Sequence, residues 1–179
     1  MEQSADEALA ELPCRCNKGT KTDSKGHWHF WVGWKAHSDW VDGDWVDGGL
    51  PVHVVTTSAS LHDSQVAIPM AKRTAQRVTW LYDLMDSAYD AKEIKQVSGQ
   101  LGHVPIIDPN RRPAHSAPLE PASVLRFRER STAERGNSRL KDEFGCRHLR
   151  VRGHAKAHLH VMLGILALFA DQLLKPLTG

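Results

Sequence analysis

The sequence has little of what marks secreted, disulfide-bonded or membrane-spanning proteins. It contains 3 cysteines in 179 residues, and no N-terminal segment combines a basic start with an apolar core. Its longest apolar run, Val161 to Ala170, is interrupted by a glycine and reaches about half of the ~20 residues that cross a bilayer. We therefore expect free thiols, a reducing cytoplasmic setting, no membrane partner and a buried helix near the C-terminus.

The chain also lacks a strong overall charge, because its net charge is only +2. The distribution is nevertheless uneven: residues 1–60 hold five Lys/Arg against nine Asp/Glu, whereas residues 124–156 hold ten against four. A basic flank of this kind favours polyanions such as nucleic acid, although an ordinary solvated surface gives the same count. The length suits one domain with a sizeable core.

Apolar periodicity predicts strands that alternate with helices, which is typical of an α/β sheet. The predicted strands are His27 to His37, Leu50 to Ser58, Thr79 to Met85 and Gly102 to Ile107. The predicted helices are Ser4 to Leu12, Asp63 to Arg77, Ala88 to Val97, a helix through Phe127 to Lys141, and His154 to Leu174. Residues 14–26 are polar and predict a loop, and the proline-rich stretch from Asp108 to Pro121 predicts an irregular connection.

A five-residue sequence, Asp-Trp-Val-Asp-Gly, occurs twice in succession, at 39–43 and 44–48. Two copies of five residues are too short for a repeat architecture, whose periods are about 20 residues or more. We expect the duplication to lengthen the loop of a hairpin.

The helix through FRERSTAERGNSRLK carries the clearest chemical pattern. Phe127, Arg130, Glu134 and Lys141 fall within roughly 60° of one another on a helix, so one carboxylate lies between two cations on a narrow face. A solvated helix with an Arg130–Glu134 pair explains the same spacing and contributes only a few tenths of a kcal/mol.

Asp86 directly follows a predicted buried strand, and reactive groups gather at the carboxyl ends of strands in α/β sheets. It could equally be the N-cap of the next helix. Together, Asp86 and Glu134 suggest carboxylates that converge on Mg²⁺ or Mn²⁺, with Arg130 and Lys141 on phosphates and Phe127 stacked on a base.

The spacing Phe127-x2-Arg130-x3-Glu134-x6-Lys141 resembles the Tyr-Arg-Glu-Lys signature of bacterial insertion-sequence DDE transposases, with Phe in the place of Tyr. SASLHDSQVAIPMA, LYDLMDSAYDAKEI, LGHVPIIDPNRR and RSTAERGNSRLKDEFG resemble segments of that family in the same order. The resemblance implies an RNase H-like mixed sheet flanked by helices and a magnesium-dependent site of three acids. Asp86, in its Asp-x2-Tyr setting, matches the second acid and Glu134 the third. Arg130, Arg139 and Lys141 would bind double-stranded DNA at transposon ends, in the nucleoid of a bacterial cell.

One part of the family pattern is missing. The first acid of such enzymes lies on a central first strand, ahead of the hairpin that here begins near His27, and we find only a short helix and a polar linker at 1–26. We therefore expect 27–175 to be a partial catalytic domain that lacks this strand and its acid, leaving a sheet edge unpaired. Asp23, in a polar loop, and Asp39, after a predicted strand, are poor replacements.

Three functions remain open from the sequence. The first is DNA cleavage and strand transfer by an impaired transposase fragment. The second is a non-catalytic DNA-binding or interaction module, which pairs with itself or with a full-length transposase. The third is a metal-dependent nuclease or hydrolase of the same fold class. A zinc site is disfavoured, because Cys14-x-Cys16 and His27-x-His29 are spaced too closely for a zinc finger.

Overall fold

The computed structural model describes residues 3–23, 25–43, 46–108 and 119–178, and the chain forms a mixed α/β structure. The strands are β1 (Asn17–Thr22), β2 (Trp28–Gly43), β3 (Val46–Ser58), β4 (Tyr82–Met85) and β5 (Val104–Ile107). The helices are α1 (Ala5–Ala10), α2 (Ser64–Thr74), the 3-10 helix η1 (Ser87–Tyr89), α3 (Lys92–Gln100), α4 (Pro121–Phe127), α5 (Arg130–Asp142) and α6 (His154–Thr178). Most of the predicted connection from Asp108 to Pro121 lies outside the described residues.

The strands form two separate sheets. One is antiparallel with the order β1-β2-β3, in which Thr22 pairs with Trp28 and Ser58 with Trp34. The other consists of β4 and β5, which run parallel and pair Tyr82 with Val104. The α/β class is thus confirmed, but the described strands do not form one continuous mixed sheet.

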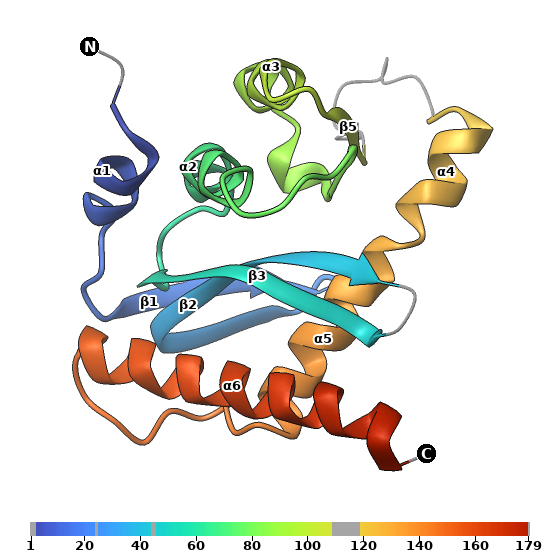
Figure 1. Ribbon diagram of the computed structural model, residues 1–179. Helices are drawn as coiled ribbons and strands as arrows, with labels where there is room; N and C mark the ends of the chain where they lie inside the picture. Colours follow the sequence, from blue (N-terminus) through green and yellow to red (C-terminus); the bar gives the residue numbers. More distant parts are fainter. Residues whose placement is uncertain (1–2, 24, 44–45, 109–118, 179) are drawn as a thin grey trace.

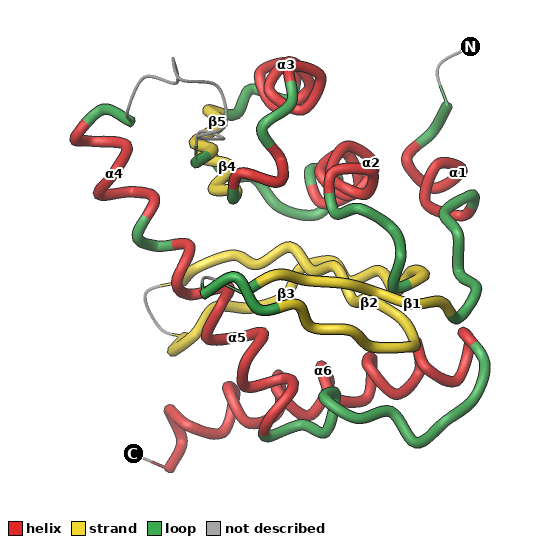
Figure 2. The backbone as a smooth tube through the Cα atoms, turned by 180° about the vertical axis from the view of Figure 1, so that it is seen from behind, coloured by secondary structure: helices red, strands yellow, loops and turns green. Residues whose placement is uncertain are grey.

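Helices cover the three-stranded sheet on both faces (Figure 1, and from behind in Figure 2). On one face, Val55 of β3 packs with a cluster formed by Leu61, Val66 and Met70 of the α2 region. On the other, the adjacent Val54 packs with Leu140, Val161 and Ile165 of α5 and α6. Successive strand residues point to opposite faces, so β3 contributes to both layers of the core.

Two segments differ from the sequence prediction at the N-terminal side. The predicted polar loop at 14–26 contains β1, because the polar residues of Asn17–Thr22 pair with the aromatic-rich start of β2 and all except Gly19 stay exposed. The strand predicted to end at His37 continues to Gly43, so that Ser38 and Asp39 lie inside β2. The first copy of the duplicated sequence therefore lengthens a strand, while residues 44–45 lie outside the described part of the chain.

The helix predicted to carry Phe127 together with Arg130 is two helices. Phe127 is the last residue of α4, and Arg130 is the first residue of α5. Between them the backbone bonds are of the tighter i to i−3 type, for example from the amide of Glu129 to the carbonyl of Arg126. The break does not separate the two side chains, because the Arg130 guanidinium lies 5.4 Å from the centre of the Phe127 ring.

Helix α5 lies against β2 through a close contact between Gly136 and Trp40. A Cβ atom built on Gly136 would lie 2.3 Å from the indole ring of Trp40. The Trp40 indole donates to Ser38 Oγ at 2.7 Å, and Ser38 Oγ donates to Asn137 Oδ1 at 3.0 Å. The glycine, which lowers the propensity for helix, is thus what lets the ring pack flat on the helix.

We expect Gly136→Ala to destabilise the protein by about 1–3 kcal/mol, because the added methyl group meets a packed ring. Gly99→Ala in α3 is the matched control, since nothing lies within 4 Å of a Cβ at that position. The control should gain up to about 1 kcal/mol from helix propensity. Urea unfolding measures both changes, and stabilisation by both substitutions would contradict the close contact.

Candidate functional site

A cavity of about 500 Å³ lies between β2, α2, β4 and the start of α5. Five consecutive residues of β2, 37–41, line it on one side, and 82–86 of β4 and its end line it on the other. The cavity brings together carboxyl groups from separate elements. These are Asp39, Asp63, Asp83, Asp86 and Glu129.

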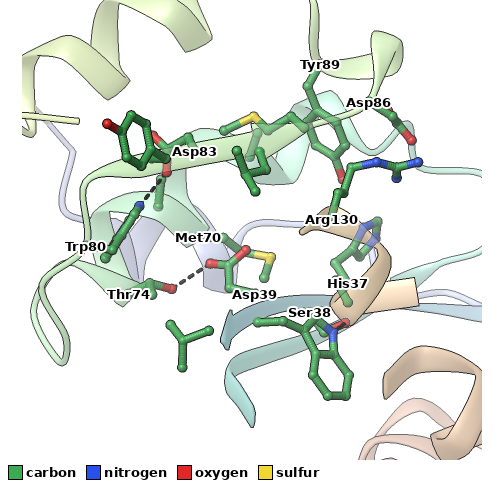
Figure 3. A pocket seen from close by; sticks show the side chains of 18 of the residues that line it. His37, Ser38, Asp39, Met70, Thr74, Trp80, Asp83, Asp86, Tyr89 and Arg130 are labelled. Carbon is green, nitrogen blue, oxygen red and sulfur yellow. Dashed lines mark hydrogen bonds between the residues drawn. The ribbon is translucent and has the colours of Figure 1, made fainter. Parts of the chain in front are cut away.

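Asp86 lies at one end of this cavity with Tyr89 and Arg130 (Figure 3). Its carboxylate accepts a hydrogen bond of 2.9 Å from the amide of Ala88, so it caps η1. The N-cap alternative for Asp86 is thus confirmed; the residue also lines the cavity, and its role as a reactive acid stays a prediction. Burial raises the pKa of the Tyr89 phenol, and the charge of Asp86 acts in the same direction.

Arg130 and Glu134 form the i,i+4 pair that their spacing predicts, with 2.6 Å between Nη2 and Oε1. The Arg130 side chain lines the cavity, whereas Glu134 is 59% exposed and does not. The structure thus brings Asp86 and Arg130 to one cavity and holds Glu134 on the far side of the guanidinium. An exposed pair of this kind has a small energy, so it is easily exchanged for other partners.

Asp39, a poor replacement for the first acid from its sequence position, also lines the cavity. It lies within β2, is half-buried, and accepts a hydrogen bond of 2.6 Å from the Thr74 hydroxyl. Burial raises the pKa of its carboxyl from 3.8 to about 6, and the charge of Asp83 adds to the effect, while Thr74 and His37 oppose it. A carboxyl whose pKa is raised by burial would be stabilised as the carboxylate by a bound cation.

Two other acids of the cavity are used by the fold. Asp63 lies 3.2 Å from both Lys35 Nζ and His37 Nδ1; although burial would raise its pKa, these partners hold it at about 2. It stands at the N-cap position of α2 but makes no side-chain cap. Asp83 is buried and accepts from Trp80 and Ser98 at 2.5 Å, which ties β4 to α3.

Some of the predicted DNA-binding residues form contacts within the protein, and others are exposed to solvent. Arg139 donates to Glu143 and Asp171, so its guanidinium holds α5 to α6. Phe127 is half-buried, with the Arg130 guanidinium 5.4 Å from its ring centre. Lys141 is exposed. Eight of the ten cations in 124–156 are exposed: Arg126, Arg128, Arg135, Lys141, Arg147, Arg150, Arg152 and Lys156.

The donors suit a hard divalent cation, but their number is small. Among the residues that the structure describes, no group of three or more His, Cys, Asp or Glu could hold a metal ion. Asp39 and Asp86 line the same cavity, and Mg²⁺ commonly binds one or two carboxylates and takes its other ligands from water and substrate phosphates. These two residues fit that incomplete donor set. Asp23 lies outside the cavity, 3.1 Å from His27 and His29 in the turn between β1 and β2.

The site is a cavity of carboxylates and one arginine at the end of a short parallel strand pair, in a mixed α/β domain. A family model described as a transposase DDE domain matches residues 18–170 of the chain. The chain therefore belongs to the family of DDE transposase domains, which gives it a function related to DNA transposition. The match includes β1, which the sequence analysis had assigned to a linker. No curated protein and no solved structure matches.

We expect Asp39→Asn to stabilise the protein at high pH. An acid whose pKa is raised on folding holds its proton more tightly in the folded state, so its favourable contribution is present below pH 3.8 and is lost as the pH rises through about 6. The amide of Asn keeps an acceptor for Thr74 and never ionises. Above pH 6 the gain should approach about 3 kcal/mol. Urea unfolding at pH 5 and 8 tests this, and an equal effect at both values would contradict it.

Proposed function

We propose that the chain supplies part of a transposase site for metal-dependent cleavage and joining of DNA strands. The observation that carries the proposal is the meeting of Asp86 and Arg130 at one cavity in a chain of this family. We take the fold to be RNase H-like, with Asp86 and Glu134 as the second and third acids of an insertion-sequence transposase. A setting in the bacterial cytoplasm, on the nucleoid, belongs to the same proposal.

The protein's own residues have separate roles in this proposal. Asp86, together with Asp39 of the same cavity and with Glu134 once Arg130 releases it, would hold Mg²⁺ or Mn²⁺, which when bound would activate the attacking oxygen and stabilise the leaving one. Arg130 binds a phosphate of the transposon end, which releases Glu134 from the pair seen in the structure. Phe127 and the exposed Lys141 extend the contact along the DNA, and Arg139 supports them by holding α5 in position.

The chain alone should show little or no strand cleavage, because the first acid is not among its residues in our proposal. The test combines it with a transposase of the same family that keeps its first acid but carries Ala at its second and third acids. Cleavage of transposon-end DNA in Mg²⁺ should appear only in the mixture. Both Asp86→Ala and Glu134→Ala in the present chain should abolish it. Robust cleavage by the chain alone, lost on Glu134→Ala, would contradict the missing acid.

DNA binding provides a second test that does not need catalysis. Lys141→Ala should weaken binding of double-stranded DNA and reduce the slope of log affinity against log salt by about 1, because one phosphate contact is lost. Lys92→Ala, at an exposed position of α3, is the matched control and should leave the slope unchanged. Fluorescence anisotropy at several salt concentrations measures both, and equal slopes for the two variants would contradict the proposed DNA-binding face.

The second candidate function is an interaction module that takes up a strand from another transposase chain. The side chains of successive strand residues point to opposite faces of the sheet. All five consecutive residues 37–41 nevertheless line the cavity, so we infer that the edge of β2, and not one of its faces, is turned toward it. The same holds for 82–86. Within the described chain, residues 34–43 of β2 pair with β3 alone and β4 pairs with β5 alone. Unpaired strand edges can form backbone hydrogen bonds with an added strand, so these two edges favour binding of an extended segment of another chain between them.

Hydrogen exchange distinguishes the module from a closed fold. In the chain alone, the cavity-facing amides of 37–41 and 82–86 should exchange rapidly. A transposase with an intact first strand should protect them when it is added, and Asp86→Ala should leave this protection intact. Amides that stay equally exposed in the mixture would exclude strand uptake.

A further inference from the structure

The cations of the acidic N-terminal third of the chain are concentrated in one hairpin. All five Lys/Arg of residues 1–60 fall within residues 15–35, where Asp23 is the single acid. Four of the five are exposed: Arg15, Lys18, Lys21 and Lys25. Asp23 lies 3.1 Å from ring nitrogens of both His27 and His29, so its carboxylate is already engaged within the turn. The hairpin of β1 and the start of β2 is therefore a second basic segment, besides 124–156.

One face of this hairpin exposes a row of large apolar side chains. Trp28, Phe30 and Val32 are alternate residues of β2, so they point to the same face, where they are 65%, 57% and 77% exposed. The rings of Trp28 and Phe30 are nearly parallel, with 16° between their planes and 6.3 Å between their centres. The intervening Trp31 is instead half-buried and packs against Gly19. Burial in the core therefore explains Trp31 but not the row.

The neighbouring strand places polar side chains beside the row. Each residue of the row has a residue of β1 directly opposite it: Lys18 pairs with Val32, Thr20 with Phe30, and Thr22 with Trp28. Directly opposite residues of an antiparallel pair share a face, and all three residues of β1 are exposed. The Lys18 ammonium lies 4.3 Å from the centre of the Phe30 ring. The face thus combines aromatic rings on one strand with a cation and two hydroxyls on the next.

A polymer that carries flat bases and anionic phosphates matches both strands of this face. Bases stack on aromatic side chains whatever their sequence, and Lys and Thr side chains bind phosphate oxygens. Bases inside a duplex stack on one another, so their faces do not reach a sheet. We propose that this face, hereafter the aromatic face, binds a single-stranded segment of nucleic acid. Its residues are Lys18, Thr20, Thr22, Trp28, Phe30 and Val32.

The residues of the aromatic face have separate roles. Trp28 and Phe30 each stack on one base, while Lys18 exchanges the Phe30 ring for a phosphate, because a cation–π contact at an exposed position is weak. The inference does not rest on the proposed function. No residue of the aromatic face lines the cavity between β2 and β4, so a strand bound here leaves the carboxylates of that cavity accessible.

Fluorescence anisotropy of a labelled oligothymidylate of about 12 nucleotides tests the proposal at several salt concentrations. The wild type should bind it. Trp28→Leu, which keeps an apolar side chain but removes the ring, should weaken binding roughly 5- to 100-fold and leave the salt slope unchanged. Trp28→Phe keeps a ring and should retain most of the affinity. Lys18→Ala should reduce the salt slope by about 0.7, because one phosphate contact to a single strand is lost.

Two matched controls separate the aromatic face from the rest of the surface. Leu81→Ala removes an apolar side chain that is 53% exposed, close to the 57% of Phe30, and should not change binding. Lys21→Ala removes a cation from the same strand but from its opposite face, and should leave the slope unchanged. All variants should keep the circular dichroism spectrum of the wild type. Competition by oligouridylate would extend the face to RNA, and failure to compete would restrict it to DNA; both agree with the proposal.

Three outcomes would overturn the proposal. One is a wild type that does not bind the oligonucleotide. The second is equal affinity of Trp28→Leu and Trp28→Phe, which would exclude stacking. The third is tighter binding of a duplex of the same length with the same dependence on Trp28, which would assign the face to double-stranded DNA.

A lipid surface is the alternative if the oligonucleotide does not bind. Flotation of the wild type with phosphatidylserine vesicles, lost in Trp28→Leu, would then assign the aromatic face to lipid. Helix α6 requires this comparison of variants. It was expected to be buried, but Leu163 and Leu166 are 56% and 61% exposed, and it is long and apolar enough between His154 and Lys175 to span a membrane. Flotation through α6 would persist in Trp28→Leu.

Discussion

The contact between Trp40 and Gly136 sets how closely α5 approaches β2, and with it where Arg130 lies. A flat indole on a residue without a side chain brings α5 close to β2, and the Ser38–Asn137 hydrogen bond sets the helix along the strand. Arg130 is six residues, or about 1.7 turns, away on the same helix, so its position at the cavity follows from this contact. A larger residue at 136 would move α5 away from β2 and displace Arg130 and Glu134 together.

The separation of the two sheets is the second constraint. Asp39 and Asp86 come from strands that no described hydrogen bond joins, yet they line one cavity. The packing of α2 against both regions keeps the strands apart, and Asp83 fixes β4 to α3 from the other side. The result is an acidic cavity with two strand edges toward it. A metal ion that also binds DNA phosphates would neutralise carboxylates of this cavity. An added strand would instead form hydrogen bonds with the edges that the described strands leave unpaired.

Local patterns in the sequence predicted the parts of the site that depend on neighbours along the chain. Asp86 follows a short apolar strand, and the Arg130–Glu134 pair follows from helical spacing. The environment of Asp39 was not predicted, because the strand was predicted to end at His37 and because its neighbours Thr74 and Asp83 are distant in sequence. The break after Phe127 has no local breaker residue. It depends on the packing of α5 on β2, which spacing alone does not contain.

The central claim is that the cavity between β2 and β4 is where a divalent cation and DNA meet. Line broadening by Mn²⁺ in the amide NMR spectrum of the isotope-labelled chain, with transposon-end DNA present, tests it most directly. The account predicts that the amides of Asp39, Asp86 and Tyr89 broaden first, and that Asp86→Asn reduces the effect. Broadening centred on the Asp23, His27 and His29 turn, with the cavity amides unchanged, would contradict it.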